Sequence, residues 1–352
     1  LLMNATIPSS TGFSTQYKNF GQTSNKGIEL ALDAVIVDTK DFGLNANFNI
    51  SYNKAKIDKL AGGQTWQSSN WGGKPAGQND FFIEEGGRLG EVYGYELDGF
   101  YTTDDFSWDG SKWILNENLT DPTELIKYNN FGPGSLKLKA DEDGKFTKKR
   151  LGNTVPTVTG GFGINMRYKN FDLSAFFNYS LGNKIVNATK LGSSYYNDTK
   201  KGWNLNDNFT LANRYSWIDP STGENMLKSS YIKSNGLDYT INRLNEINAG
   251  ASMYNPGSIT EMPLLDWAVE DGSFLRVNNI SIGYTLPKVF VNKMFMQNVR
   301  IYVTGYNLYC FTKYSGADPE VDTRRSTPMT PGVDYSAYPK SRSFVGGINV
   351  TF

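Results

Sequence analysis

The chain has 352 residues, which is enough for about two ordinary domains or one large β domain. Its 35 Lys and Arg residues balance 35 Asp and Glu residues, and no basic stripe stands out, which argues against a nucleic-acid partner. The sequence contains no His and a single Cys, so Ser-His-Asp catalysis, Cys-His catalysis and an intrachain disulfide are excluded.

The composition favours a β protein with many turns. Tyr and Phe, which prefer strands, occur 21 times each, and Gly occurs 36 times. No apolar run approaches the ~18 residues of a transmembrane helix, but the short strands of a membrane barrel would not produce such a run. The first ten residues lack an initiator Met and the basic and apolar regions of a signal peptide, so we expect a fragment of a longer protein.

The first two predicted strands are residues 25–38 and 42–53, joined by a short turn. In the second strand apolar residues alternate strictly with Gly, Asn and Ser, so one face is apolar and the other polar. A long excursion over residues 54–156 follows, rich in Gly, Asn, Asp and Trp, with one strand-like piece at 91–101. The pattern therefore predicts a hairpin followed by a long loop.

The next hairpin alternates over both of its arms, residues 157–168 and 171–181. The polar turn Lys169-Asn170 joins the arms. Each arm is about as long as the ~9–11 residues that cross a bilayer as a tilted strand. A soluble β-sandwich would show the same alternation, so this hairpin alone does not identify the fold class.

A second long excursion leads to the last three predicted strands, which are residues 273–286, 298–310 and 343–352. The apolar positions of the first of these change phase, and a β-bulge near Asn278-Asn279 would bring them back to one face. A third loop, residues 311–342, contains several prolines and precedes the last strand.

Short turns alternate with long excursions along the whole chain, as in transmembrane barrels with short periplasmic turns and long extracellular loops. The strand-like piece at 91–101 lies between an upward and a downward strand, so we place it in an extracellular loop. Seven strands cannot close a barrel, and an open edge in lipid leaves backbone groups unpaired. The remaining strands must therefore come from sequence outside this chain.

Seven stretches of the chain resemble, in order, the SusC/RagA-like TonB-dependent transporters of the Bacteroidota outer membrane. They are NKGIEL (25–30), DTKDF (38–42), YGYELDGF (93–100), LGNTVPTVTGGFGINMRYKNFDLSAFF (151–177), DGSFLRVNNISIGYTLP (271–287), VRIYVTGYNLYCFTKYSGADPEV (299–321) and YPKSRSFVGGINVTF (338–352).

The resemblance implies an all-β fold, an antiparallel transmembrane β-barrel of 22 strands of which this chain would hold the last seven or so. The N-terminal plug and the earlier strands would be absent from it. It also implies import of oligosaccharides or peptides, driven by TonB–ExbB–ExbD, beneath a SusD-like surface lipoprotein lid. The terminal Phe352 matches the signal that the barrel-assembly machinery reads. Cys310 departs from the residue type expected at its position.

The aromatic candidates for contact with a solute or a lid protein are the Trp residues, because Trp and Tyr dominate interface hot spots. Long loops also need small cores of their own, and for any single Trp we favour that role. All seven lie outside the predicted strands: Trp66, Trp71, Trp108, Trp113, Trp203, Trp217 and Trp267.

One acidic turn resembles the start of a calcium loop, with Asp141 and Asp143 at alternating positions before Gly144. The twelfth position of such a loop would be Gly152 rather than a bidentate Glu. We therefore favour a solvated acidic turn over a structural Ca²⁺ site, and we expect no other cofactor.

Polar positions on the strands would line the lumen, where they would contact a plug or a solute. They are Asn45, Asn47, Asn49, Arg167 and Asp172. In the third loop, the segment Asp318-Pro319-Glu320-Val321 and the pair Arg324-Arg325 would contact a lid or form exposed ion pairs of little energetic value.

We predict a multi-pass protein of the cell outer membrane that is not an enzyme. The alternative is a surface-exposed β-rich module that binds glycans through its loop Trp and Tyr residues without transport. The two differ in the apolar strand faces: the module buries them in its interior, whereas the barrel presents them to lipid.

Overall fold

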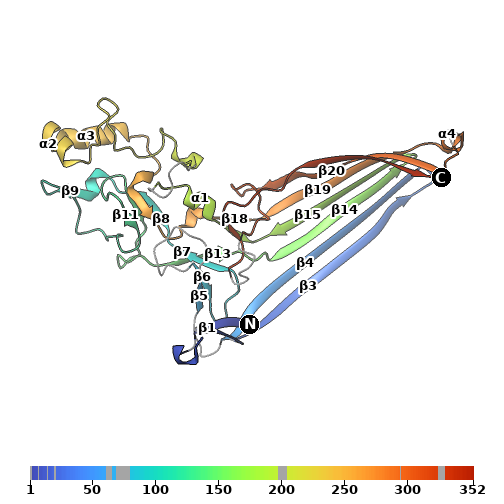
Figure 1. The fold of residues 1–352 in the computed structure, drawn as a ribbon, viewed down its shortest axis with the longest axis horizontal. Coiled ribbons are helices and arrows are strands. Elements are labelled where there is room, and N and C mark those ends of the chain that lie inside the picture. Colours follow the sequence, from blue (N-terminus) through green and yellow to red (C-terminus); the bar gives the residue numbers. More distant parts are fainter. Residues whose placement is uncertain are drawn as a thin grey trace.

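The computed structural model describes residues 2–6, 8–13, 15–19, 21–60, 66–68, 80–196, 204–293, 295–323 and 330–352. A sheet of long strands occupies one end of the molecule and a body built from the long loops occupies the other (Figure 1). Among the helices of the described residues, none is long and apolar enough to cross a membrane.

The main sheet has seven antiparallel strands, and each of them overlaps one of the ranges predicted to form a strand. Strands that are neighbours in this series also pair in the sheet, with β3 at one edge and β22 at the other (Figure 1). In chain order they are β3 (Gly21–Asp38), β4 (Phe42–Leu60), β14 (Val158–Tyr168), β15 (Phe171–Leu181), β19 (Phe274–Thr285), β20 (Asn298–Thr312) and β22 (Ser343–Thr351).

The predicted β-bulge in β19 is confirmed. The register of β19 against β20 shifts between Val277 and Asn279, and its register against β15 shifts between Phe176 and Phe177. The extra residue lets Val277 and Ile280 lie on the same face despite their different parity, which keeps the apolar face continuous.

Strands β3 and β4 are longer than predicted. They pair with each other from Asp38↔Gly43 to Gly21↔Leu60, although β14 pairs with β4 only as far as Tyr52. The prediction ended at residue 53 because the apolar positions change phase there. The backbone ladder continues with Lys54, Lys56 and Asp58 on the face that is apolar up to Tyr52, whereas Ala55 and Ile57 lie on the other face.

A glycine in β19 lets an ion pair cross the sheet over an intervening strand. Asp172 of β15 and Arg300 of β20 form two hydrogen bonds of 2.9 and 2.6 Å. Gly283 of β19 pairs with both Asp172 and Tyr302 and lies beneath this contact. A Cβ atom at Gly283 would lie 2.5 Å from an oxygen of Asp172 and from a nitrogen of Arg300.

We therefore expect Gly283→Ala to displace the ion pair and to lower the free energy of unfolding by about 1 kcal/mol, the value of a partly exposed pair. Gly346→Ala in β22 is the matched control, because its Cβ would meet nothing closer than 4.0 Å. Denaturant unfolding in detergent or lipid measures both variants. Equal costs for the two would contradict the close approach at Gly283.

The long loops fold into a single body, here called the loop cap, which comprises the described residues of 61–156, 182–272 and 313–342. Its short strands form small sheets: β5 (Trp66–Ser68), β6 (Phe81–Ile83), β7 (Glu91–Gly94) and β13 (Lys149–Asn153); β8 (Leu97–Phe100) and β12 (Leu136–Leu138); β9 (Phe106–Trp108) and β10 (Trp113–Leu115); β11 (Lys127–Tyr128) and β17 (Ile259–Glu261); β16 (Lys184–Asn187), β18 (Val269–Asp271) and β21 (Val333–Asp334).

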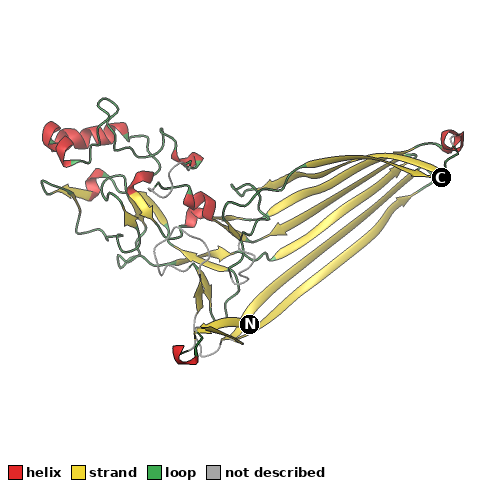
Figure 2. Ribbon diagram, in the orientation of Figure 1, coloured by secondary structure: helices red, strands yellow, loops and turns green. Residues whose placement is uncertain are grey.

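The predicted strand-like piece at 91–101 forms β7 and β8 in two of these small sheets, outside the main sheet. Three helices of the loop cap are α1 (Ala188–Gly192), α2 (Ser229–Asn235) and α3 (Leu237–Ile247). Helix α4 (Lys288–Lys293) lies at the opposite end, in the connection between β19 and β20 (Figure 2). A separate hairpin, β1 (Leu2–Thr6) with β2 (Thr15–Asn19), precedes the main sheet.

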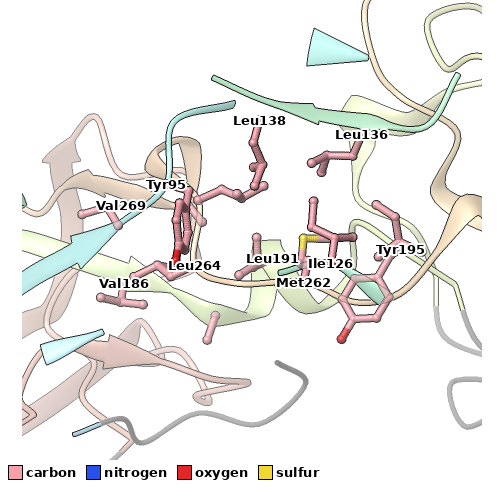
Figure 3. Close-up of a cluster of buried hydrophobic side chains, with 14 of the residues drawn as sticks. Tyr95, Ile126, Leu136, Leu138, Val186, Leu191, Tyr195, Met262, Leu264 and Val269 are labelled. Atoms are coloured by element: carbon pink, nitrogen blue, oxygen red, sulfur yellow. The ribbon is translucent and has the colours of Figure 1, made fainter. Parts of the chain in front are cut away.

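Two hydrophobic clusters hold the loop cap together. The first combines residues from all three long loops, for example Leu136, Leu191 and Val333, which are fully buried (Figure 3 shows Leu136 and Leu191). The second joins the first two loops and includes the buried Tyr101 and Met226. The loops therefore pack against one another rather than extending separately into solvent.

Candidate functional site

The apolar face of the main sheet is exposed over its whole length. Phe48, Ile164 and Val350 retain 36%, 39% and 40% of their accessible surface, and Leu173 is partly exposed. The register places Phe48 beside Phe162 and Leu32, so apolar side chains continue from strand to strand. An apolar surface of this extent marks an interaction with another molecule or with a membrane.

Aromatic side chains line the end of this apolar face that lies near the short turns. Phe42, Tyr168, Phe171 and Tyr284 pair in one row across four strands, and the rings of Phe171 and Tyr284 lie 4.7 Å apart. Near the loop cap, the exposed Tyr52 ends the same face of β4.

The spacing of these aromatic residues matches the thickness of a membrane. The strand between Phe42 and Tyr52 is about 33 Å long, at ~3.3 Å per residue, which corresponds to about 25 Å along a membrane normal for a strand tilted by ~40°. An apolar band about 25 Å tall with an aromatic girdle at each interface is typical of the lipid-facing surface of transmembrane barrels.

The opposite face of the sheet is polar. Asn45, Asn47 and Asn49 of β4 lie on it, and Asn49 accepts a hydrogen bond from the backbone N–H of Gly161. Arg167 donates to the backbone carbonyl oxygens of Thr39 and Lys40, so it braces the turn between β3 and β4. The residues predicted to line a lumen therefore share this polar face, which we call the inner face.

A buried ion-pair network fastens the third loop to the inner face near the loop cap. Arg276 of β19 lies 2.6 Å from a carboxylate oxygen of Asp318 and 2.6 Å from one of Glu320. It also donates to Asn307 at 2.6 Å. The side chains of Arg276 and Asp318 are each only 4% exposed. The half-exposed Lys340 also pairs with Glu320, at 2.6 Å.

This network corrects the sequence prediction for the segment 318–321. We expected exposed ion pairs of little value, but Asp318 is buried with a charged partner on β19. The only sequence signal for that partner was an Arg at a polar position of the strand, because 42 residues separate Arg276 from Asp318. The pair Arg324-Arg325 lies outside the described residues.

The fastened loop borders a cleft of about 600 Å³ at the loop end of the inner face. Neutral polar residues, Thr159 and Asn178, line it from the sheet, and Pro319, Val321 and Pro331 line it from the third loop. Its volume and mixed lining are within the range of small-molecule sites. The cleft has room for part of a polar ligand that also carries some apolar surface.

Four of the Trp candidates lie in or against the cores of the loop cap. Trp113 and Trp217 are buried in the second cluster, and Trp108 packs edge-on against Trp113 at 5.5 Å. Trp217 donates to the carbonyl of Pro133. Trp267 packs against the first cluster, with the Lys190 ammonium 4.7 Å from its ring.

The structure describes one of the other three Trp candidates. Trp66 lies in β5, while Trp71 and Trp203 lie outside the described residues. Contact of the seven Trp residues with a solute or a lid therefore stays a prediction, and Trp108 and Trp267, which are partly exposed, are the best placed for it.

The acidic turn is organised by its own backbone. Asp141 accepts hydrogen bonds from the backbone N–H groups of Asp143 and Lys145 and from the hydroxyl of Thr147, whereas Asp143 is exposed. Within the described residues, no group of three or more His, Cys, Asp or Glu residues is placed to hold a metal ion. The contacts of Asp141 are those of a turn-forming Asp.

A second carboxylate organises the outer part of the loop cap. Asp219 accepts hydrogen bonds from the hydroxyl of Tyr231 at 2.6 Å, the backbone N–H of Ser221 at 3.0 Å and the guanidinium of Arg243 at 3.2 Å. These donors, the Tyr231 hydroxyl foremost, hold the pKa of Asp219 at about 2. Asp219 thereby joins the 216–226 segment to both helices α2 and α3.

The low pKa predicts an acid-sensitive region. The pKa of an unfolded Asp is ~3.9, so Asp219 stabilises the fold fully above that pH, and this stabilisation is lost as the pH falls through about 2. Hydrogen exchange of α2 and α3 should accelerate over this window, beyond the intrinsic pH effect. Asp219→Asn should exchange faster at pH 7 and lose the extra acceleration. The same pH profile in both proteins would contradict this role.

Comparison with known proteins gives consistent matches over the full length of the chain. It is 31% identical to TonB-dependent receptor P3 of Formosa agariphila, with 100% of the chain and 31% of the relative aligned. It is 25% identical to TonB-dependent receptor SusC of Bacteroides thetaiotaomicron, of which it covers 29%. The chain thus spans about a third of the length of these curated relatives. No protein-family model matches it.

The fold comparison agrees. The structure of the RagAB peptide transporter matches the whole chain with a TM-score of 0.58 at 22% identity, and 32% of that structure is covered. The resemblance to SusC/RagA-like TonB-dependent receptors and the all-β barrel-type fold predicted from the sequence are confirmed. The matched proteins are named receptors and transporters, in agreement with the prediction that the chain is not an enzyme.

Proposed function

Because the chain matches SusC/RagA-like TonB-dependent receptors over its whole length in sequence and fold, we propose that it forms part of an outer-membrane importer. In this proposal the main sheet is a section of the barrel wall that crosses the membrane several times. The loop cap lies on the extracellular side, and the short turns face the periplasm.

The exposed apolar face of the main sheet carries the proposal. A soluble glycan-binding module would cover Phe48, Ile164 and Val350 with a second layer, and no described residue forms such a layer over them. The acyl chains of a membrane would cover an apolar face about 25 Å tall, and the polar inner face suits a hydrated lumen. The alternative of a binding module without transport is disfavoured for this reason.

We assign oligosaccharides or peptides as the solute class. The cleft between the sheet and the third loop offers hydroxyl and amide groups beside proline surfaces, which suits sugar rings and peptide backbones. The carboxylates that line the cleft are Glu320, which pairs with Arg276 and Lys340, and Asp322. A neutral solute is therefore favoured over a strongly anionic one.

The proposed partners follow from the same assignment. A SusD-like surface lipoprotein would close over the loop cap, where Leu211, Ile218 and Tyr239 expose apolar surface. TonB–ExbB–ExbD would supply the energy through the plug of the complete receptor. The barrel-assembly machinery would recognise the C-terminal end, where Phe352 follows β22 and is 77% exposed.

Two measurements test this function. Membrane fractionation should find the intact protein in the outer membrane, with a gel mobility that changes on heating. In cells, uptake of an oligosaccharide or peptide mixture, followed by mass spectrometry of the medium, should require both this gene and TonB, while surface binding persists without TonB. A soluble intact protein, or uptake indifferent to TonB, would contradict the proposal.

A further inference from the structure

A cluster of basic side chains lies on the outward face of the sheet, just beyond the apolar band. We call it the basic patch, and it lines a hollow of about 630 Å³ together with Asp58 and Glu91. The basic patch consists of Lys26 of β3, Lys54 and Lys56 of β4, and Arg88 and Arg150 of the loop cap.

Strand periodicity fixes the position of the basic patch. Lys54 follows Tyr52 by two residues, and Lys26 precedes Ile28 by two, so each lysine lies on the face of its apolar neighbour, about 7 Å further along the strand. Tyr52 and Ile28 are both exposed. The patch therefore begins where the lipid-facing surface ends, on the side of the loop cap.

The arginine side of the patch is held there by backbone pairing. Beyond Tyr52, where β14 no longer borders β4, the residues before Arg88 take its place: Gly86 donates to the carbonyl of Ile57, and Ile57 donates to that of Gly87. This pairing extends the sheet surface and brings Arg88 alongside the lysines of β4. The positive charges thus come from two separate parts of the chain.

The basic patch carries excess positive charge that the protein leaves uncompensated. Lys26 and Lys54 are directly opposite each other on paired strands, an arrangement in which like charges repel. Arg150 pairs with Glu91 at 2.6 Å. In the part of the chain that the structure describes, Lys26, Lys54, Lys56 and Arg88 form no ion pair. An anion bound among these basic side chains would reduce the repulsion between them.

We propose that the basic patch binds the phosphorylated headgroup of an outer-leaflet lipid. This inference rests on the proposed membrane location, because only then does an anionic lipid surface lie at the height of the patch. A lysine near an anionic membrane surface strengthens binding by about 1 kcal/mol, or about fivefold. The lipid's acyl chains would lie along the apolar face beside Ile28 and Tyr52.

The test uses the intact receptor, purified in neutral detergent, and synthetic lipid A with and without its phosphate groups. Native mass spectrometry or thermophoresis gives the affinities. We expect the phosphorylated lipid to bind more tightly. Combined Lys54→Gln and Lys56→Gln changes should weaken its binding about 30-fold, whereas Lys54→Arg with Lys56→Arg should preserve it.

The matched control is Lys228→Gln with Lys233→Gln, two exposed lysines of the loop cap far from the patch in sequence, which should bind like the unchanged receptor. Equal affinity for the dephosphorylated lipid, or no loss in the Lys54/Lys56 variant, would overturn the proposal. So would displacement of the lipid by inorganic phosphate at equal concentration, which would indicate a site for free anions. A receptor that stays in the outer membrane while failing these tests would leave the proposed function intact.

Discussion

Phe48→Lys is expected to lower the free energy of unfolding in lipid by about 2–4 kcal/mol, the cost of a lysine on the lipid face near the bilayer midplane. Phe48 lies between the aromatic ends of β4 and pairs with Leu32 and Phe162 on the exposed apolar face. To reach water, the ammonium group of the new lysine would have to extend along the strand toward one of the two membrane interfaces. Denaturant unfolding in phospholipid vesicles, followed by Trp fluorescence and heat-dependent gel mobility, measures the loss.

Asn47→Lys is the matched control, because it places the same charge one residue away on the inner face. Asn47 is directly opposite Asp33 on β3, so a lysine there would find both water and an acidic neighbour. We expect a change of less than about 1 kcal/mol. Similar costs at both positions would show that the facing of the strands is wrong, and with it the barrel assignment.

The second large effect is expected for Arg276→Met, at about 3–5 kcal/mol, because it leaves the buried Asp318 without its partner. We expect the third loop to detach from the inner face, which would expose residues 311–342 to protease and open the cleft beside it. Limited proteolysis of the folded receptor and solute-binding assays report these changes separately from global unfolding.

Two further variants make this result interpretable. Lys340→Met removes a half-exposed cation from the rim of the same network and should cost less than about 1 kcal/mol. Combining Arg276→Met with Asp318→Leu removes both buried charges and should recover part of the loss, although Glu320 would still lack its arginine. A double variant as unstable as the sum of its parts would contradict coupling between Arg276 and Asp318.

The main sheet was predictable because its signal is local. Side chains alternate at a period of two residues, so the apolar and polar faces can be read from each strand alone, and even the bulge in β19 appears as a change of phase. The extension of β4 beyond Asn53 was missed because the two faces exchange character there: Lys54 and Lys56 continue the face that was apolar, and Ile57 lies on the other face.

The loop cap and its contacts could not be predicted from the sequence, because they depend on residues far apart in the chain. Arg276 and Asp318 meet only once the third loop folds back onto β19. The Trp residues were recognised as either binding or core groups, and Trp113 and Trp217 lie in a core that joins two loops. Nothing in the spacing of these residues specifies which loop packs against which.

The common core of the three long loops has an evolutionary consequence. Val333 pairs with Val186 of the second loop, and both share a cluster with Val92 of the first. A new sequence in one loop would leave voids or clashes in the other two. Evolutionary change should therefore replace all three segments together, and chimaeras that exchange a single loop should misfold where exchange of all three loops is tolerated.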